Sequence, residues 1–304
     1  MDRIVIVTKP TRLEELVREH FTLGAARFAL ESREQSADLY EAEDAAQRDA
    51  LAEIRRQIPN DIPVTSVTRE DLPGFLFRDT DFVIVCGPDG LFVNTAKYIS
   101  GQLVLTVNPD PRSVAGVLML FPPQAVGATI AKVLAGQHRT ERLPFIKAQI
   151  DDDVVVWGVN DIFLGRRDQI SARYAIAFGG AHERQSSSGI IVSSGVGATG
   201  WLRSIVTMVT GLSGTTRPSQ LSALPHATRS ELVFVVREPF PSPGAGTELL
   251  TGRVLPGRPL SVISEMPDGG CVFSDGIVEK AVEWPAGSRV TVSVGDRYVR
   301  RIVR

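Results

Sequence analysis

An apolar run that ends in a glycine-flanked turn constrains this chain more than any other segment. Residues 82–85 are strand-forming, and the turn Gly87-Pro88-Asp89-Gly90 that follows presents one carboxylate. In an α/β fold, ligands bind in the loops after the carboxyl ends of strands. Glycines there let backbone N–H groups approach phosphate oxygens, and a carboxylate can take the proton of a hydroxyl that attacks a phosphate. An isolated match would more simply be a turn with Asp-Gly at its corner.

Strand and helix patterns alternate over the first 125 residues. Strands are expected at residues 4–7, 63–67, 82–85 and 103–107. Helical patterns cover residues 12–19, 41–56, 91–100 and 124–134. This rhythm implies a parallel sheet that is covered by helices on both faces. We therefore predict an N-terminal α/β domain over residues 1–125.

Short β-rich runs separated by turn clusters dominate the rest of the chain. The runs are residues 154–157, 175–178, 190–192, 232–236 and 290–294. Such spacing is typical of a mostly antiparallel β domain. We expect the boundary near Pro122-Pro123 or just beyond residues 124–134, and we assign residues 126–304 to this C-terminal domain.

Composition excludes several classes of protein. The 304 residues include 33 Lys and Arg against 35 Asp and Glu, whereas a nucleic-acid binder is typically strongly basic, so no nucleic-acid partner is expected. Cys86 and Cys271 are the two cysteines, which excludes a disulfide framework and fits a reducing cytoplasm. The N-terminus lacks a signal-peptide pattern, and no segment approaches about 18 uninterrupted apolar residues. We expect a cytoplasmic protein without a membrane partner.

Two later segments place polar groups beside predicted strands. The pair Asn160-Asp161 offers amide donors, an amide acceptor and a carboxylate, which suit the neighbouring hydroxyls of a ribose; a type I turn that opens a strand explains it equally well. The Ser/Gly-rich residues 186–201 lead from a strand into a helix-like stretch, and such a loop suits an anion or a dinucleotide. Because this loop lacks both the P-loop lysine and the Rossmann glycine spacing, a flexible loop before a helix would explain it if it stood alone.

In this order, the three segments resemble the NAD kinase family. Its members show a Gly-Gly-Asp-Gly loop, then an Asn-Glu pair, then a Ser/Thr-Gly-rich loop that ends in an aromatic residue, here Trp201. Residues 7–12 and 107–111 are similar to the branch that includes the mitochondrial NAD kinases. The resemblance covers roughly residues 3–205.

The resemblance implies a kinase that transfers a phosphoryl group from ATP, or another donor, to the 2′-hydroxyl of the adenosine ribose of NAD, giving NADP. It implies Mg²⁺ held largely by the phosphates, no protein metal site, and a homodimer or homotetramer. By motif match, Asp89 would be the catalytic base, with Gly87 and Gly90 near phosphate. The NAD-binding residues would be Asn160, Asp161, Ser194, Gly195, Gly197, Thr199 and Trp201.

Three further polar residues are candidates for phosphate binding. Lys9 and Arg12 follow the first predicted strand, again at a carboxyl end, where a phosphate contact is a reasonable expectation. Asn94 lies three residues before Lys97 on the predicted helix after Asp89, so the two share a face. A phosphate contact and a solvated helix face both stay open for that pair.

The chain also departs from the family pattern. Pro88 replaces the second glycine and has no N–H to donate, and Leu91 replaces a threonine. Val196 and Ala198 stand where hydroxyl residues are common. These departures keep two alternatives open: a kinase for another nucleoside or sugar hydroxyl, and a non-catalytic sensor that binds NAD(H) or NADP(H).

Overall fold

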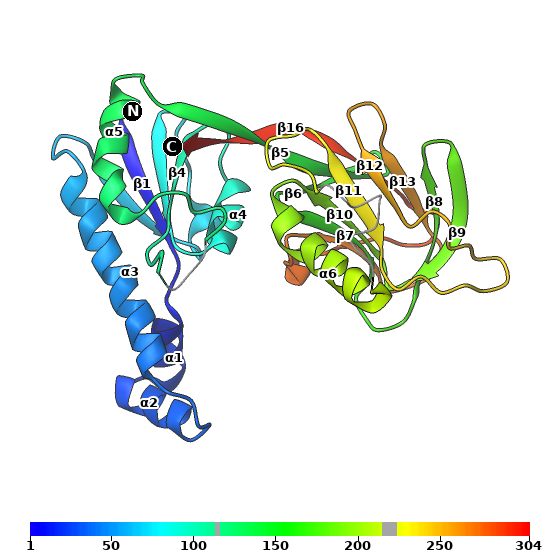
Figure 1. Ribbon diagram of the computed structural model, residues 1–304, viewed down its shortest axis with the longest axis horizontal. Helices are drawn as coiled ribbons and strands as arrows, with labels where there is room; N and C mark the ends of the chain where they lie inside the picture. Colours follow the sequence, from blue (N-terminus) through cyan, green and yellow to red (C-terminus); the bar gives the residue numbers. More distant parts are fainter. Residues whose placement is uncertain (113–115, 215–223) are drawn as a thin grey trace. The chain divides into compact units, whose positions relative to one another are not determined.

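The computed structural model describes residues 1–112, 116–214 and 224–304, which form two compact units (Figure 1). Unit 1 comprises Met1–Glu141 with Val299–Arg304, and unit 2 comprises Arg142–Tyr298. The expected boundary at residue 125 therefore differs from this division. Helix α5 (Val126–Leu134) belongs to unit 1 because Val126 and Ile130 are buried in its core.

Unit 1 contains the predicted parallel sheet. The strands are β1 (Arg3–Thr8), β2 (Val64–Thr68), β3 (Asp81–Cys86), β4 (Leu103–Val107) and the end of β16 (Arg289–Val303). Their order is β2-β1-β3-β4-β16, and each neighbouring pair is parallel. All six residues of β3 are buried, as expected for a central strand of a sheet that is covered on both faces. The C-terminal strand is the one member of this sheet that we had assigned to the second domain.

Helices cover both faces of this sheet, as predicted. In Figure 1, α3 (Asp38–Gln57) and α5 lie on one side and α4 (Asp89–Ala96) lies on the other. Thr11 is the N-cap of helix α1 (Arg12–His20), and its side chain forms a capping box with that of Glu14. Helix α2 (Leu23–Glu31) was not predicted, and the 3-10 turns are η1 (Leu72–Gly74) and η2 (Pro123–Ala125).

Unit 2 is built from two sheets, and its pairing confirms the antiparallel β domain. One sheet contains β5 (Arg139–Ile150), β6 (Val154–Gly158), β8 (Ala172–Phe178), β9 (Ala181–Ser187), β13 (Leu260–Ser264) and β16. The other has the order β12 (Thr251–Val254), β11 (Leu232–Val236), β10 (Ile190–Ser194), β7 (Asp161–Arg166), β14 (Gly270–Ser274) and β15 (Val282–Glu283). Every neighbouring pair of this second sheet is antiparallel.

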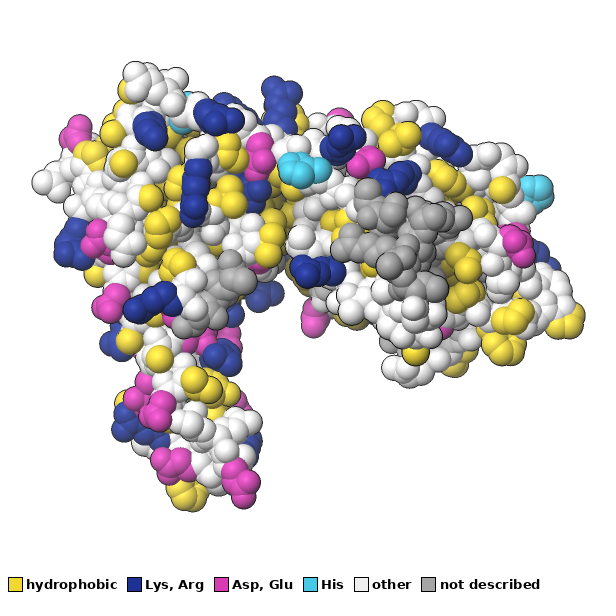
Figure 2. Space-filling model, in the orientation of Figure 1, with side chains coloured by type: hydrophobic (Ala, Val, Ile, Leu, Met, Phe, Trp, Pro, Cys, Tyr) yellow, Lys and Arg dark blue, Asp and Glu magenta, His cyan; other side chains and the backbone are white. Residues whose placement is uncertain are grey.

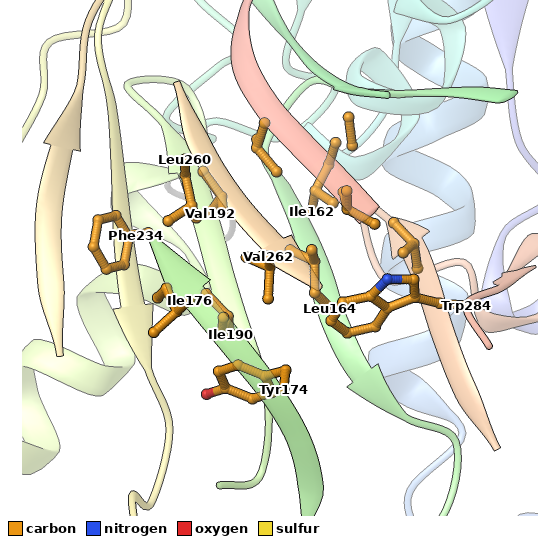
Figure 3. Close-up of a cluster of buried hydrophobic side chains, with 14 of the residues drawn as sticks. Ile162, Leu164, Tyr174, Ile176, Ile190, Val192, Phe234, Leu260, Val262 and Trp284 are labelled. Carbon is orange, nitrogen blue, oxygen red and sulfur yellow. The ribbon is translucent and has the colours of Figure 1, made fainter. Parts of the chain in front are cut away.

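The second sheet of unit 2 is buried on both faces. Ile162 and Leu164 point into a core that also contains Tyr174 and Trp284 (Figure 3). Phe163 points the other way, into a cluster under α6 (Trp201–Ser213). Successive side chains alternate between faces, so a strand covered on both sides is apolar at every position. This explains the apolar run of residues 190–192 in β10 and the wholly apolar sequence of β11.

The surface is mixed in charge on the face shown in Figure 2, where basic and acidic side chains are interspersed. In the part of the chain that the structure describes, no helix is long and apolar enough to cross a membrane.

Candidate functional site

The Asp89 loop lies at the carboxyl end of the parallel sheet in unit 1. Strand β3 ends at Cys86, and the Gly87 N–H donates to the carbonyl of Val107 at the end of β4 (3.2 Å). Pro88 is the N-cap of α4, and Asp89 is its first residue. A carboxylate in the first turn of a helix is stabilised by the positive end of the helix dipole.

Two backbone amides orient the half-buried Asp89 carboxylate. The Leu118 N–H donates to Oδ1 (2.9 Å) and the Val117 N–H donates to Oδ2 (3.0 Å). An ionised carboxylate offers about four acceptor sites, so about two remain for other donors. Asp89 is therefore held in one orientation while it keeps the capacity to accept a proton from a hydroxyl.

The residues around Asp89 explain how this loop accommodates its unusual sequence. Leu91 is 1% exposed, and a Cβ added at Gly87 would lie only 2.9 Å from Leu91 Cδ2. Leucine at this position thus packs against the glycine instead of offering a hydroxyl to a ligand. Pro88 and Gly90 are exposed, and a Cβ added at Gly90 would meet nothing within 4 Å.

Cys86, next to this loop, is not a nucleophile. Burial raises the pKa of its thiol to about 12, against a smaller opposing effect of the Gln47 side chain. Because the thiolate is the reactive form, the protonated thiol is inert at neutral pH.

The three candidates for phosphate binding in unit 1 are placed differently. Lys9 directly follows β1 and is half-buried. Arg12 donates to Glu43 Oε2 (2.5 Å), and its Cζ lies 4.7 Å from the centroid of the Tyr40 ring. Its guanidinium is therefore engaged with α3. Asn94 is half-buried on α4, five residues after Asp89 and so on a different face of the helix.

In unit 2, the Asn160 turn between β6 and β7 is held by a carboxylate that the sequence analysis did not identify. Asp275 Oδ1 accepts the backbone N–H groups of Val159 (3.0 Å), Asn160 (2.7 Å) and Asp161 (3.2 Å), and its Oδ2 also accepts from Val159 (3.2 Å). Three N–H groups therefore converge on this carboxylate, and Val159 shares its N–H between the two oxygens. The available signal was a second Asp-Gly pair directly after an apolar strand.

The Ser/Gly-rich loop packs directly on the Asn160 turn. The Ser194 N–H donates to the Asn160 carbonyl (2.9 Å), and Ser194 Oγ donates to the Val159 carbonyl (2.5 Å). A Cβ at Gly197 would lie 2.1 Å from the Asn160 carbonyl oxygen, and one at Gly195 would lie 2.0 Å from that of His226. The Asn160-Asp161 pair and the Ser/Gly-rich loop are therefore in contact. Both glycines are required by contacts within the chain itself.

The Asn160 side chain has a hydrogen-bond acceptor without a partner. Its Oδ1 is buried without a partner, a property it shares with only two other side-chain atoms in the described residues, His20 Nε2 and His138 Nδ1. Since a buried polar atom without a partner is costly, this oxygen fits a donor supplied by a ligand, such as a ribose hydroxyl. Asp161 beside it is 6% exposed.

The last two predicted residues lie at the start of α6. Thr199 is exposed in the turn η3 (Gly197–Thr199). The Trp201 ring stacks on Phe163 at 5.9 Å between centroids, and Arg237 Cζ lies 5.5 Å from its centroid. Trp201 thus already has two side-chain partners in unit 2. Nearby Val196 and Ala198, each 2% exposed, are buried in the protein interior instead of facing a ligand.

No metal centre is formed by the described residues: none of their His, Cys, Asp and Glu side chains gather in a group of three or more that could hold an ion.

Comparisons with known proteins give the fold. The sequence matches no family model and no curated protein. Among solved structures, yeast NADH kinase complexed with NADH matches with a TM-score of 0.65 at 12% identity, over 99% of this chain and 83% of that chain. An NAD kinase from Archaeoglobus fulgidus in complex with ATP matches with a TM-score of 0.61 at 17% identity, over 99% and 93% of the two chains. The chain therefore has the fold of these NAD and NADH kinases.

Proposed function

We propose that the chain is a phosphotransferase of the NAD kinase type, which transfers a phosphoryl group from ATP or another donor to the 2′-hydroxyl of the adenosine ribose of NAD. The observation that carries this proposal is the Asp89 carboxylate, oriented by two amides and left with about two free acceptor sites. The shared fold with NAD and NADH kinases supports it. The mitochondrial branch, a cytoplasmic location and a homodimer or homotetramer belong to the same proposal.

In this mechanism, Asp89 accepts the proton of the attacking hydroxyl, and the rest of the site positions the two substrates. The Mg²⁺ that accompanies ATP would be held by the phosphates and would offset their negative charge. Gly90 would give the phosphates access to the start of α4, while Gly87 would act by leaving room for Leu91 to pack against the loop. Lys9, Arg12 and, from another face of α4, Asn94 would supply polar groups to the phosphates. Arg12 would first have to leave Glu43.

On the dinucleotide side, Asn160 and Asp161 would bind ribose hydroxyls, with Asn160 Oδ1 gaining the donor that it lacks. Ser194, Gly195 and Gly197 would act by holding the Asn160 turn in place. Thr199 and Trp201 would flank the adenine or ribose from the start of α6.

The test is the transfer reaction itself. Purified protein is incubated with NAD, NADH or nucleosides, each with ATP or polyphosphate, and mass spectrometry detects the gain of one phosphate. Asp89→Asn removes the proton acceptor, so turnover should fall by about 10²–10⁴-fold while NAD affinity changes little. Because the Asn amide also turns an N–H toward Val117 or Leu118, thermal unfolding of the variant is measured in parallel.

Asp151→Asn is the matched control. Asp151 also accepts a backbone N–H, from Arg289 (2.8 Å), but belongs to none of the three motifs, so turnover should stay at the wild-type level. Full activity in Asp89→Asn would agree with the proposed kinase function but would exclude Asp89 as the catalytic base.

A second function is favoured by Pro88, which offers no N–H to a phosphate at an exposed position of the loop. A sensor that binds NAD(H) or NADP(H) without transfer would retain dinucleotide binding. A wild type that binds NAD tightly yet phosphorylates no acceptor with any donor would establish the sensor and reject the kinase.

A further inference from the structure

Arg301, near the C-terminus, is a buried arginine in unit 1 that no sequence motif singles out. It lies on β16, pairs in register with Val104 of β4, and is 5% exposed. A buried guanidinium is stable only when its N–H groups find acceptors, so its partners are informative.

The Arg301 guanidinium has three kinds of partner. Its Nε donates to Glu141 Oε1 (2.7 Å), and a second nitrogen donates to the same oxygen. The third nitrogen donates to the Leu118 carbonyl (2.9 Å). Its Cζ lies 5.8 Å from the centroid of the Phe92 ring on α4.

These partners connect Arg301 to Asp89 by two routes. Leu118 donates its N–H to Asp89 Oδ1 and accepts the Arg301 N–H at its carbonyl, so one residue links the two side chains. Phe92 lies three residues after Asp89 on the same helix, which places it on the next turn of the same face. Arg301 therefore contacts both structures that orient the carboxylate, the 117–118 backbone and the first turns of α4.

We propose that Arg301 is a positioning residue for Asp89: anchored by Glu141, it holds the Leu118 carbonyl so that the Val117 and Leu118 amides aim at the carboxylate. This inference rests on the proposed function of Asp89 as the base. Arg301 itself does not contact a substrate in this proposal, and it acts only through Leu118 and Phe92.

The geometry requires arginine and not merely a positive charge. A guanidinium presents its N–H groups in a fixed plane, so it can bind Glu141 on one edge and Leu118 on the other while stacking on a ring. The single ammonium of lysine is a compact point charge on a flexible stem. Arg301→Lys therefore keeps the charge beside Glu141 but loses the fixed bridge to Leu118.

Unit 1 contains a matched control for this change. Arg3 also pairs with a buried carboxylate, Asp81 (Nε to Oδ1, 2.9 Å), donates to a backbone carbonyl, that of Leu76 (3.4 Å), and lies over a phenylalanine ring, that of Phe75 (5.2 Å). In the part of the chain that the structure describes, none of these partners is hydrogen-bonded to Asp89. Arg3→Lys should therefore cost stability without moving Asp89.

The experiment compares wild type, Arg301→Lys and Arg3→Lys by steady-state kinetics with NAD and ATP. In Arg301→Lys, kcat should fall about 10–100-fold, because a small misplacement of a reacting group has effects of this size, while KM for NAD stays within about twofold. In Arg3→Lys, kcat should also stay within about twofold of wild type. A kcat of Arg301→Lys equal to that of Arg3→Lys would overturn the proposal.

Hydrogen exchange gives a readout that does not depend on activity. The Leu118 amide should exchange faster in Arg301→Lys than in wild type, and at the wild-type rate in Arg3→Lys. Unchanged exchange in Arg301→Lys overturns the proposal. If the wild type transfers no phosphate, the proposed function fails, and the exchange of Leu118 alone then supports or overturns the role of Arg301 in holding this segment.

Should Arg301→Lys fail to fold, Glu141→Gln replaces it, since it weakens the anchor but leaves the bond from Arg301 to Leu118. It should lower kcat less than tenfold and speed Leu118 exchange, and wild-type values of both would overturn the proposal.

Discussion

Asp89 in unit 1 and Asp275 in unit 2 begin from the same local sequence and end in different roles. Each is followed by glycine, each comes after an apolar strand, and each accepts hydrogen bonds from successive backbone amides. Asp89 accepts two, one on each oxygen, whereas the amides of Val159, Asn160 and Asp161 make four contacts with Asp275. Asp89 therefore keeps acceptor capacity on both oxygens for a substrate, whereas Asp275 Oδ1 is fully used by the backbone of the turn.

Hydrogen-bond partners, and not local sequence, separate the reactive carboxylate from the structural one. The sequence around the two residues does not distinguish them, and both are half-buried. What distinguishes them is the number of amides that the surrounding backbone aims at each. The same reasoning applies to glycines: Gly195 and Gly197 are required by contacts with the chain itself, whereas Gly90 faces open space.

The largest expected effect tests this contrast between glycines. Gly197→Ala would place a methyl group 2.1 Å from the Asn160 carbonyl oxygen, so the turn must shift, and the free energy of unfolding should fall by about 3 kcal/mol. Gly90→Ala meets nothing and lies in a helix, so it should gain about 0.5–1 kcal/mol. Chemical denaturation measures both. Equal free energies of unfolding for Gly197→Ala and Gly90→Ala would show that the Ser/Gly-rich loop can relax. Its glycines would then not be required by contacts within the chain.

ATP binding by Gly197→Ala and Gly90→Ala gives a second test of the contrast between the two glycines. In the proposed function, the backbone at Gly90 approaches a phosphate, so Gly90→Ala should weaken ATP binding although the protein is more stable. Isothermal titration of the two variants and wild type measures this. Wild-type ATP affinity in Gly90→Ala would place the phosphates elsewhere.

A smaller effect is expected from Asp275→Asn. Asparagine retains Oδ1, the oxygen that accepts from all three amides, and tolerates the positive φ of 53° at this position. It removes the charge, and hydrogen bonds to charged groups are stronger than those to neutral ones, so the free energy of unfolding should fall by about 1–2 kcal/mol. The exposed Asp296→Asn is the control, with no change expected. Chemical denaturation measures the free energy of unfolding of both variants. An unchanged value in Asp275→Asn would mean that the Asn160 turn is stable without the Asp275 charge.

The smallest effect concerns a carboxylate that holds mainly a side chain. Arg166 lowers the pKa of Asp168 from 3.8 to about 2 by hydrogen bonding. A depressed carboxyl pKa contributes stability above the unfolded-state value, and this contribution is lost as the pH falls from about 4 to about 2. Thermal unfolding across this range should therefore show a shallower loss of stability in Asp168→Asn than in wild type. Parallel curves would show that this surface pair does not stabilise unit 2.

Local patterns predicted much of the fold because they depend only on neighbouring residues. The apolar runs at residues 82–85 and 190–192 are strands, and the helical pattern at residues 41–56 falls within α3. Helix α2 was missed, because its formation depends on what it packs against. The placement of α5 with unit 1 depends on packing in the same way, and the sequence left both ends of that helix open as the domain boundary. The return of β16 to the parallel sheet likewise depends on partners that are distant in the chain.

The candidate site divides in the same way. Periodicity and turn chemistry are local, so the amino-acid sequence alone predicts that Asp89 follows a buried strand and begins a helix, and that a polar pair and a Ser/Gly-rich loop come later. Packing between distant segments makes Leu118 donate an N–H to Asp89 and accept one from Arg301, brings three amides to Asp275, and leaves Asn160 with an unfilled acceptor. Each of these depends on hydrogen bonds between residues far apart in sequence, and a carboxylate's remaining capacity can be counted only when its partners are known.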